Sequence, residues 1–365
     1  MIIPRRQFLR TIPWLAAATV IPGGCQARRP APTVKTAAAT TGSGPNPFAP
    51  PKVGGSTRME DAGAVVPAVV KTADPKSCRI LQFTDLHFFH ETAEKDQATL
   101  ADCRRQIERH HPDLVVISGD LWHDNPQGHG QSYLEFAIRE FEGWGVPWTT
   151  CWGNHDLVDD YQRAHDALRQ ARGSCYRGEA THGDYRLEVR AGTDVATAAP
   201  RLDLFFLNSH ADGLGPWQAQ SLKSMLTATA RMDGRPVPAL AFFHIAICEY
   251  ETKLTGTNFT GVKMEGAAHG REAGEIYPVL AGSGRIKACF CGHSHTNDYV
   301  VKTGPVDLHF GRSTGYAGYG GDRVRKGAKL IVVDLAKGSY EQRSVFADGS
   351  SVVESTRANS VPHVC

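Results

Sequence analysis

Short apolar runs alternate with helical patterns over most of the chain from about residue 79 onward. An apolar run bounded by polar or glycine-containing segments predicts a buried strand, and apolar residues at helical spacing predict an amphipathic helix. The predicted strands are 79–83, 113–118, 148–152, 202–207, 239–243, 288–291 and 330–333. The predicted helices are 97–110, 132–143, 160–172, 218–230 and one near 271–280.

This alternation predicts an α/β domain with right-handed crossovers and a largely parallel sheet. Ligands of such sheets collect beyond the carboxyl ends of the strands. Asp85, Asp120 and Asn154 each follow a predicted strand. We therefore expect these three polar side chains to meet at one edge of the sheet.

The two ends of the chain lack this pattern. Residues 26–75 are rich in Pro, Ala, Thr and Gly and have little hydrophobic periodicity, which predicts a disordered linker. The folded domain is predicted to span 76–346, and the polar stretch 347–365 is predicted to be a frayed tail.

Residues 1–25 read as an export signal. Arg5 and Arg6 precede Phe8 and Leu9, and the apolar stretch that follows, 12–21, is shorter than the ~20 residues that span a bilayer. The paired arginines resemble a twin-arginine (Tat) signal, and an ordinary secretory signal remains the alternative. Either route predicts an exported protein, in the periplasm or on the outer face of a membrane.

Cys25 ends this segment after small residues, as in a bacterial lipoprotein site, although Pro22 fits that motif poorly. Lipidation, with a lipid anchor to a membrane, and loss of Cys25 on signal cleavage both remain open. The chain has nine cysteines. Eight would remain if Cys25 were acylated, an even number that suits disulfides in an oxidising compartment, although buried free thiols are the default for several of them.

Five short motifs with metal-ligating residues follow one another along the chain. They are Asp85-Leu86-His87, Gly119-Asp120, Gly153-Asn154-His155-Asp156, a lone His244, and Gly292-His293-Ser294-His295. Residues two apart in extended chain point the same way, so Asp85 with His87 can hold one ion. A carboxylate such as Asp120 can bridge two cations. Together the motifs predict a two-metal site that acts on phosphoesters.

A single histidine in an apolar strand, as His244 is, usually belongs to the core. The other four motifs make a ligand role the better interpretation of His244, because one imidazole is what the set lacks. Most remaining histidines, including His90 and His165, are interpreted as surface residues. The formal net charge of +2 comes from scattered residues and shows no nucleic-acid footprint.

These motifs resemble those of the calcineurin-like metallophosphoesterases, and the stretch from Cys78 to about Leu335 carries the resemblance. Within that superfamily the chain is most similar to purple-acid-phosphatase-like proteins, through His244-Ile245-Ala246, the residues after His295, and Gly315 to Gly320. The resemblance implies a four-layer α/β/β/α sandwich. It also implies one metal held by Asp85, His87, Asp120 and His295 and a second held by Asp120, Asn154, His244 and His293.

The chain departs from the purple enzymes at one position. They carry a tyrosine three residues after the bridging aspartate, whose tyrosinate binds iron(III), whereas this chain has His123. His87 is expected to take over as ligand. The two ions therefore remain open among Mn, Fe and Zn, because mixed nitrogen and oxygen ligands suit all three.

The expected reaction is direct hydrolysis of a phosphate monoester, a small phosphorylated substrate, by a water that bridges the two metals. His155, oriented by Asp156, is expected to protonate the leaving oxygen, although Asp156 is also a plausible helix N-cap or turn residue. A phosphodiesterase or nucleotidase acting on nucleotides or lipid headgroups is the alternative enzyme. A metal-binding domain without turnover and an envelope scaffold are the non-catalytic alternatives, and the oligomeric state is open.

Overall fold

The computed structural model describes residues 62–191, 198–229, 231–232, 235–270 and 274–352, all within one structural unit, 48–365. The predicted export signal, the lipidation candidate Cys25 and most of the predicted linker lie outside the described residues, as does the predicted tail from residue 353. No helix among the described residues is long and apolar enough to cross a membrane.

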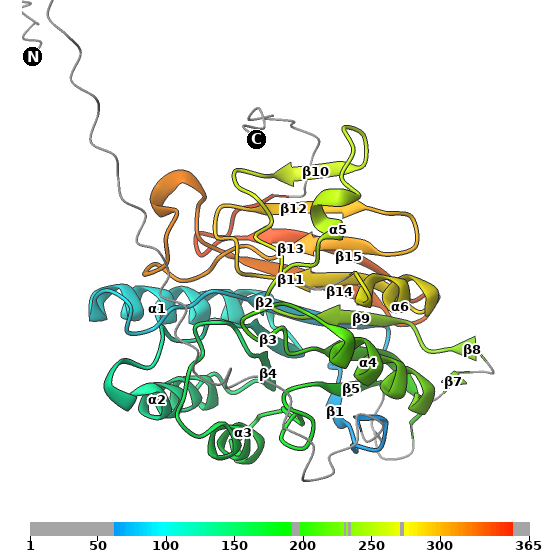
Figure 1. Ribbon diagram of the computed structural model, residues 1–365, viewed down its shortest axis with the longest axis horizontal. Helices are drawn as coiled ribbons and strands as arrows, with labels where there is room; N and C mark the ends of the chain where they lie inside the picture. Colours follow the sequence, from blue (N-terminus) through cyan, green and yellow to red (C-terminus); the bar gives the residue numbers. More distant parts are fainter. Residues whose placement is uncertain (1–61, 192–197, 230, 233–234, 271–273, 353–365) are drawn as a thin grey trace, which may run out of the picture. The chain divides into compact units, whose positions relative to one another are not determined.

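Two large β-sheets form the centre of the domain (Figure 1). One has six strands in the order β16-β15-β14-β2-β3-β4, the other has eight in the order β1-β5-β6-β9-β11-β13-β12-β10, and β7 pairs only with β8. The strands of the six-stranded sheet are β2 (Ser77–Phe83), β3 (Leu114–Ser118), β4 (Trp148–Cys151), β14 (Ala328–Asp334), β15 (Ser339–Val345) and β16 (Ser351–Val352). The other strands are β1 (Ala68–Lys71), β5 (Tyr185–Arg190), β6 (Pro200–Phe206), β7 (Arg231–Met232), β8 (Arg235–Pro236), β9 (Ala239–Phe242), β10 (Phe259–Val262), β11 (Ile286–Cys291), β12 (Asp298–Lys302) and β13 (Asp307–Phe310).

Both sheets are mixed, which corrects the prediction of a largely parallel sheet. The central strands β2, β3 and β4 pair in parallel, as do β6, β9, β11 and β13. Antiparallel strands extend both sheets, through β14 and β15 in one and through β12 and β10 in the other. The added β15 has the polar sequence SYEQRSV, so it gives no apolar run by which a strand can be predicted.

Helices cover the outer faces of the two sheets. They are α1 (Ala93–His110), α2 (Gly130–Glu142), α3 (Tyr161–Gln170), α4 (Pro216–Ala228), α5 (Glu249–Thr252) and α6 (Ile276–Gly282), with short 3-10 turns at Pro126–Gly128 and Gly321–Arg323. Thr92 and Asp160 cap α1 and α3 by accepting hydrogen bonds from backbone N–H groups of the first turn. Every predicted helix and strand is therefore present, with shifted ends.

Two apolar cores explain the layering. Successive strand residues point to opposite faces, so Phe206 and Phe242 lie in one core and their neighbours Phe205 and Ala241 in the other. The first core joins the facing sides of the two sheets and the helices α1, α2 and α3, and the second joins the eight-stranded sheet to α4 and α6 (Figure 1). The predicted four-layer α/β/β/α sandwich is confirmed.

The boundaries of the domain lie further out than predicted. Strand β1 falls inside the predicted linker and pairs in parallel with β5, with Val70 buried. Strand β16 falls inside the predicted tail and pairs with β15. Both are too short to produce a hydrophobic pattern, and their partners hold them in place through backbone hydrogen bonds.

Six cysteines are buried thiols without a disulfide: Cys78, Cys103, Cys151, Cys175, Cys289 and Cys291. Burial raises the pKa of the Cys175 thiol to about 11, and the pKa of each of the other five also lies above its ordinary value because of burial. These six side chains act as small apolar core residues. His165 is likewise buried, against the surface interpretation, with its Nδ1 2.5 Å from the hydroxyl of Tyr176.

Candidate metal centre

The five motifs meet where the central strands of both sheets end. Asp85, Asp120 and Asn154 follow β2, β3 and β4 of the six-stranded sheet. His244 follows β9, and the segment with His293 and His295 follows β11, both in the eight-stranded sheet. Backbone hydrogen bonds join the loops across this edge, for example from the N–H of Asp85 to the carbonyl of Gly119 at 3.1 Å. The expected place of the site, beyond the carboxyl ends of the strands, is confirmed.

Asp85, His87 and His295 form the first group of ligand atoms, which all lie within 4.8 Å of one another. The Nε2 atoms of His87 and His295 are 3.0 Å apart, and Nε2 of His295 is 3.4 Å from Oδ1 of Asp85. All three side chains are buried. Two imidazole nitrogens and a carboxylate oxygen that face one another at this spacing can coordinate one cation.

Asp120, His244 and His293 form the second group, again within 4.8 Å. Oδ2 of Asp120 lies 3.1 Å from Nε2 of His244 and 3.5 Å from Nε2 of His87, which belongs to the first group. The Asp120 carboxylate therefore stands between the two groups, as a ligand shared by two cations would.

Oδ1 of Asn154 is buried and has no hydrogen-bond partner, and Nε2 of His244 is buried with only the Asp120 carboxylate beside it, at 3.1 Å. A buried atom of this kind destabilises a fold unless it binds something. Both are ordinary metal-ligand atoms, and both belong to motifs predicted to bind the second metal. The residues present thus fit a pair of cations.

Backbone carbonyls orient two of the imidazoles. Nδ1 of His244 donates to the carbonyl of Ser118 at 2.8 Å, and Nδ1 of His295 donates to the carbonyl of Tyr319 at 3.2 Å. A proton held at Nδ1 leaves the lone pair of Nε2 available to a cation. The protein thereby directs both Nε2 atoms into the centre.

The loops at this centre adopt strained backbone conformations. Asp85, His87, Asp120 and His293 all have positive φ, between 48° and 74°. Such conformations are unfavourable for residues other than glycine and concentrate at functional sites. Gly153 shows how closely the loops pack, because a Cβ there would stand 2.1 Å from Oδ1 of Asp120.

Burial and neighbouring charges set the protonation states. Burial lowers the pKa of His87 to about 3 and that of His293 to about 4, so both rings are neutral. Burial opposes protonation of His244 as well, but the Asp120 carboxylate raises its pKa to about 9. Without a cation, a proton on His244 therefore balances part of the carboxylate charge, and a bound cation would replace that proton.

The expected partner of His155 is wrong. Nδ1 of His155 lies 2.8 Å from Oδ1 of Asp124, whereas the carboxylate of Asp156 accepts backbone hydrogen bonds from Asp120 at 3.0 Å and from Gly153 at 2.7 Å. Burial and the nearby Asp120 raise the pKa of Asp156 to about 7. The turn between residues 155 and 156 directs the two side chains apart, so Asp156 fixes the loops and Asp124 orients His155.

His123 is a site residue to which sequence reasoning gave no role. Its ring stacks on His155 with centroids 4.3 Å apart, and its Nδ1 lies 3.0 Å from Nδ1 of His87. Since Nε2 of His87 faces the first group, His123 touches the outer side of that ring and stays outside the centre. His87 thus lies with Asp85 and His295 in the first group, where the sequence predicts it as a ligand.

Sequence reasoning missed Glu265 and named Tyr319 only within the stretch Gly315 to Gly320, without a role. The Tyr319 ring stacks on His295 with centroids 4.0 Å apart, and its hydroxyl donates to the carboxylate of Glu265 at 3.0 Å. Neither residue belongs to a spaced motif. The sequence did contain one signal for His123 and Asp124 as site residues. Both lie within four residues after the predicted ligand Asp120.

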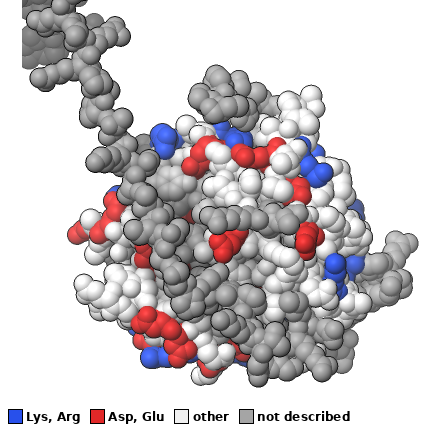
Figure 2. Space-filling model, viewed as in Figure 1, with Lys and Arg blue, Asp and Glu red and all other residues white. Residues whose placement is uncertain are grey.

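A hollow of about 140 Å³ opens onto the centre. His87, Asp120, His155, His293 and His295 line it, together with His90, His123, Gly318 and Tyr319. Among the described residues no Lys or Arg lines it, although Nζ of Lys326 donates to the carbonyl of the lining residue Tyr319 at 3.3 Å. On the face in Figure 2, acidic and basic side chains are scattered.

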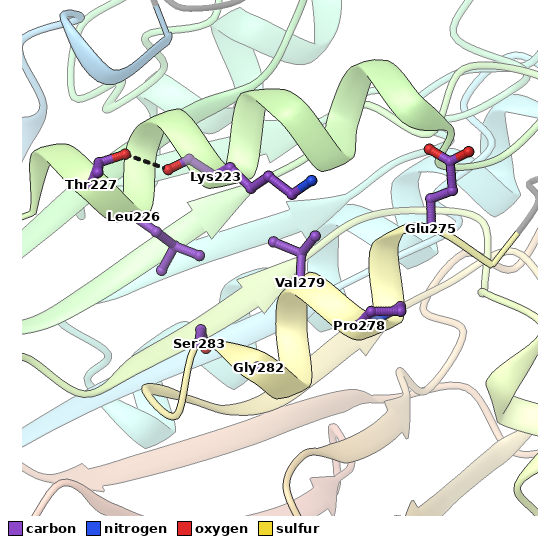
Figure 3. A pocket seen from close by; sticks show the side chains of 8 residues that line it. All are labelled: Lys223, Leu226, Thr227, Glu275, Pro278, Val279, Gly282 and Ser283. Atoms are coloured by element: carbon purple, nitrogen blue, oxygen red, sulfur yellow. Dashed lines mark hydrogen bonds between the residues drawn. The ribbon is translucent and has the colours of Figure 1, made fainter.

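A second hollow, of about 710 Å³, lies between α4 and α6 (Figure 3). Leu226, Pro278 and Val279 line it with Lys223 and Glu275, and none of the motif residues reaches it. It lacks convergent reactive groups despite its larger size. The chemistry of this chain belongs to the smaller hollow.

Comparison with known proteins decides the family. The profile described as calcineurin-like phosphoesterase matches residues 78–297, more than half of the chain. The chain belongs to this family. The match begins in β2 and ends just after His295, so it covers all five motifs.

Relatives of this phosphoesterase carry different functional descriptions. "Probable inactive purple acid phosphatase 28" of Arabidopsis thaliana is 29% identical over 73% of this chain and 77% of its own length. "Phosphatase DCR2" of Saccharomyces cerevisiae is 24% identical over 67% of this chain and 48% of its own length. The structure "GAP50 the anchor in the inner membrane complex of Plasmodium" covers 77% of this chain and 90% of its own, with a TM-score of 0.50 and 11% identity, and supports the fold alone.

Proposed function

We propose that this phosphoesterase is an exported, metal-dependent enzyme that hydrolyses phosphate monoesters. The observation that carries the proposal is the convergence of two ligand groups around Asp120, with a buried and unpartnered oxygen on Asn154. Mn, Fe and Zn all suit this mixture of imidazole, carboxylate and amide ligands.

The ligand sets follow from the two groups. One cation would be held by Asp85, His87 and His295. The other cation would be held by His244, His293 and Asn154. Asp120 would bind both cations. Bound cations would supply Lewis-acid polarisation of the phosphoryl group and an activated water. The chain itself orients these ligands, keeps Lys and Arg out of the hollow and places His155 at its wall.

His155 is the proposed proton donor. Its Nδ1 pairs with Asp124, which leaves Nε2 free to give a proton to the departing oxygen of the substrate. The side chain is about one third exposed, at 32%, so it can reach both the substrate and solvent. Asp156 holds the loop that carries His155 and takes no direct part.

The size of the hollow supports a monoester. A space of about 140 Å³ accepts a phosphoryl group but little of the rest of a substrate. A monoester needs only one exit, for the leaving group. A diester needs room for a second substituent beside His90, His123 or Tyr319.

Relatives named as probable inactive phosphatases favour a second candidate, a metal-binding domain without turnover. A screen of the metal-loaded protein against mono- and diesters separates the possibilities. Faster turnover of monoesters supports the proposal, and preference for diesters overturns the substrate assignment. Metal uptake without turnover of any ester supports the non-catalytic candidate.

Export is proposed from Arg5 and Arg6 and the apolar residues after them, which lie outside the described residues. Replacing both arginines with lysine should retain folded precursor in the cytoplasm if the twin-arginine route is used. Normal secretion of that variant would point to the general secretory route. The mass of the mature N-terminus would show whether Cys25 carries a lipid.

A further inference from the structure

A third group of ligand atoms stands outside the two inner groups, at the mouth of the hollow. It consists of Nε2 or Nδ1 of His123, a carboxylate oxygen of Asp124 and a ring nitrogen of His155, all within 4.8 Å. Oδ1 of Asp124 is 2.8 Å from Nδ1 of His155, and Oδ2 of Asp124 is 3.6 Å from Nε2 of His123. Both imidazoles thus present a ring nitrogen to the Asp124 carboxylate, so the three side chains offer one cation two nitrogens and an oxygen.

Backbone contacts hold this outer group in place independently of its side chains. The N–H of Asp124 donates to the carbonyl of His155 at 2.9 Å, and the N–H of His123 donates to the carbonyl of Phe88 at 3.0 Å. Three segments of the chain are thereby fixed against one another before any ion binds. Preorganisation of this kind lowers the entropy that a ligand must overcome to bind.

We propose that His123, Asp124 and His155 form a third metal site, suited to zinc and weaker than the two inner sites. Two imidazoles and one carboxylate with an open, solvent-facing position are a common zinc ligand set. The exposed fractions of the side chains, 23% for His123 and 48% for Asp124, leave room for water to complete the coordination.

The outer site is separated from the inner pair by His87. The outer nitrogen of that ring, Nδ1, contacts His123 at 3.0 Å, whereas its Nε2 faces His295. The His87 ring would thus separate a third cation from the two inner cations. Repulsion between like charges and the single carboxylate of the outer site both weaken its binding, so it should fill only when zinc exceeds two equivalents.

Occupation of the outer site would hold the His155 ring on the metal, away from the position in which Asp124 orients it as a donor. Zinc that binds Nδ1 of His155 replaces the proton that Asp124 accepts there, and that proton passes to solvent. The ring is then held by the metal and no longer by Asp124. Inhibition by excess zinc follows, and this second step rests on the proposed function, whereas binding itself does not.

The test is a count of zinc in the full chain. Protein with both inner sites loaded is titrated with Zn²⁺ against a chromogenic chelator, and His123→Gln is compared with His269→Gln, the same change at an exposed histidine elsewhere. We expect one zinc fewer per chain in His123→Gln than in the wild type, and no loss in His269→Gln. Equal counts in all three proteins would overturn the proposal.

A second variant is needed because His123 contacts the inner ligand His87, so His123→Gln could lose zinc by disturbing the inner centre. Asp124→Asn leaves every inner ligand side chain in place and should also lose one zinc. Retention of the full count in Asp124→Asn would overturn the site even if His123→Gln loses zinc.

Activity is measured separately. For each protein, the turnover rate with excess zinc is divided by the rate with two zinc ions per chain. In the wild type and His269→Gln this ratio should fall several-fold, and in His123→Gln it should stay near one. A third zinc that leaves the wild-type rate unchanged would overturn the inhibitory step alone. Absence of turnover at two metals would contradict the proposed function and leave the zinc count to decide the site.

Discussion

Two buried polar clusters of this domain differ in how their charges are balanced. At the metal centre, Oδ1 of Asn154 has no hydrogen-bond partner, and the Asp120 carboxylate pairs with the imidazole of His244 at 3.1 Å. In the second cluster, the buried carboxylate of Asp298 accepts from Nζ of Lys329 at 2.6 Å and from the hydroxyl of Ser344 at 2.6 Å, and pairs with Arg312 at 2.5 Å.

The electrostatics follow this difference. Burial opposes ionisation of Asp298, but Lys329 and Arg312 hold its pKa below the ordinary value. Asp120 depends instead on imidazoles, chiefly His244, for its balance. Lysine and arginine keep their protons under almost all conditions, whereas an imidazole can give its proton up to a metal. The comparison teaches that Asp298 is balanced by groups that keep their charge, whereas at the metal centre the charge of Asp120 is balanced by imidazoles that bound cations can take over.

The largest expected effect tests the Asp298 cluster. Asp298→Asn should lower the free energy of unfolding by about 3–5 kcal/mol, because it leaves two buried cations without their anion. Asp120→Asn should have a much smaller effect on the metal-free protein, since His244 can lose its proton. Denaturant unfolding of both variants without metal provides the measurement. Equal losses would remove the distinction between the two clusters.

The next largest expected effect is the loss of turnover when the proton donor is replaced. His155→Ala should reduce turnover by roughly 10² or more, the usual contribution of a positioned acid, while both inner metals stay bound. Asp124→Asn should reduce it less, because the donor remains and only its orientation is lost. Rates and metal content measured on the same samples check this. Loss of an inner metal from His155→Ala would show that His155 is a ligand of the inner pair.

The sequence predicted the centre of the fold better than its edges. The run Leu114–Ser118 is entirely buried and gave a clear strand, whereas β15 has too few apolar residues to be found. The ligands were predictable because each ends a strand within a short motif. Asp156 was assigned wrongly because neighbours in sequence were assumed to be neighbours in space, and the turn between them separates their side chains.

Metal uptake should depend on pH. This effect is expected to be smaller than that of replacing the proton donor and larger than the effect on colour. The pKa of His244 is raised to about 9, so below that pH a cation must displace its proton. Affinity for the second metal should then fall about tenfold for each unit of pH lowered. The proton's own stabilising contribution is present at low pH and is lost as the pH rises through about 9, which favours the metal further. Metal affinity that stays constant from pH 6 to 8 would contradict the assignment of His244.

The smallest expected effect is on colour. Purple enzymes absorb visible light through a tyrosinate bound to iron(III), and this chain has His123 at that position. Tyr133 and Tyr161 lie in α2 and α3, and Tyr319 directs its hydroxyl to Glu265. The oxidised, iron-loaded protein should lack an intense visible band. A band that disappears in Tyr319→Phe would make that tyrosine a ligand and require a new ligand set for the first metal.

The central claim is that the two ligand groups that share Asp120 bind cations. Elemental analysis after gel filtration at low free metal tests it most directly, because only tightly bound ions remain. We expect two transition-metal ions per chain in the wild type, fewer than one in Asp120→Asn, and two in Asp298→Asn if that variant stays folded. A wild type that takes up no metal on reconstitution, or an Asp120→Asn variant that retains two, would contradict the account.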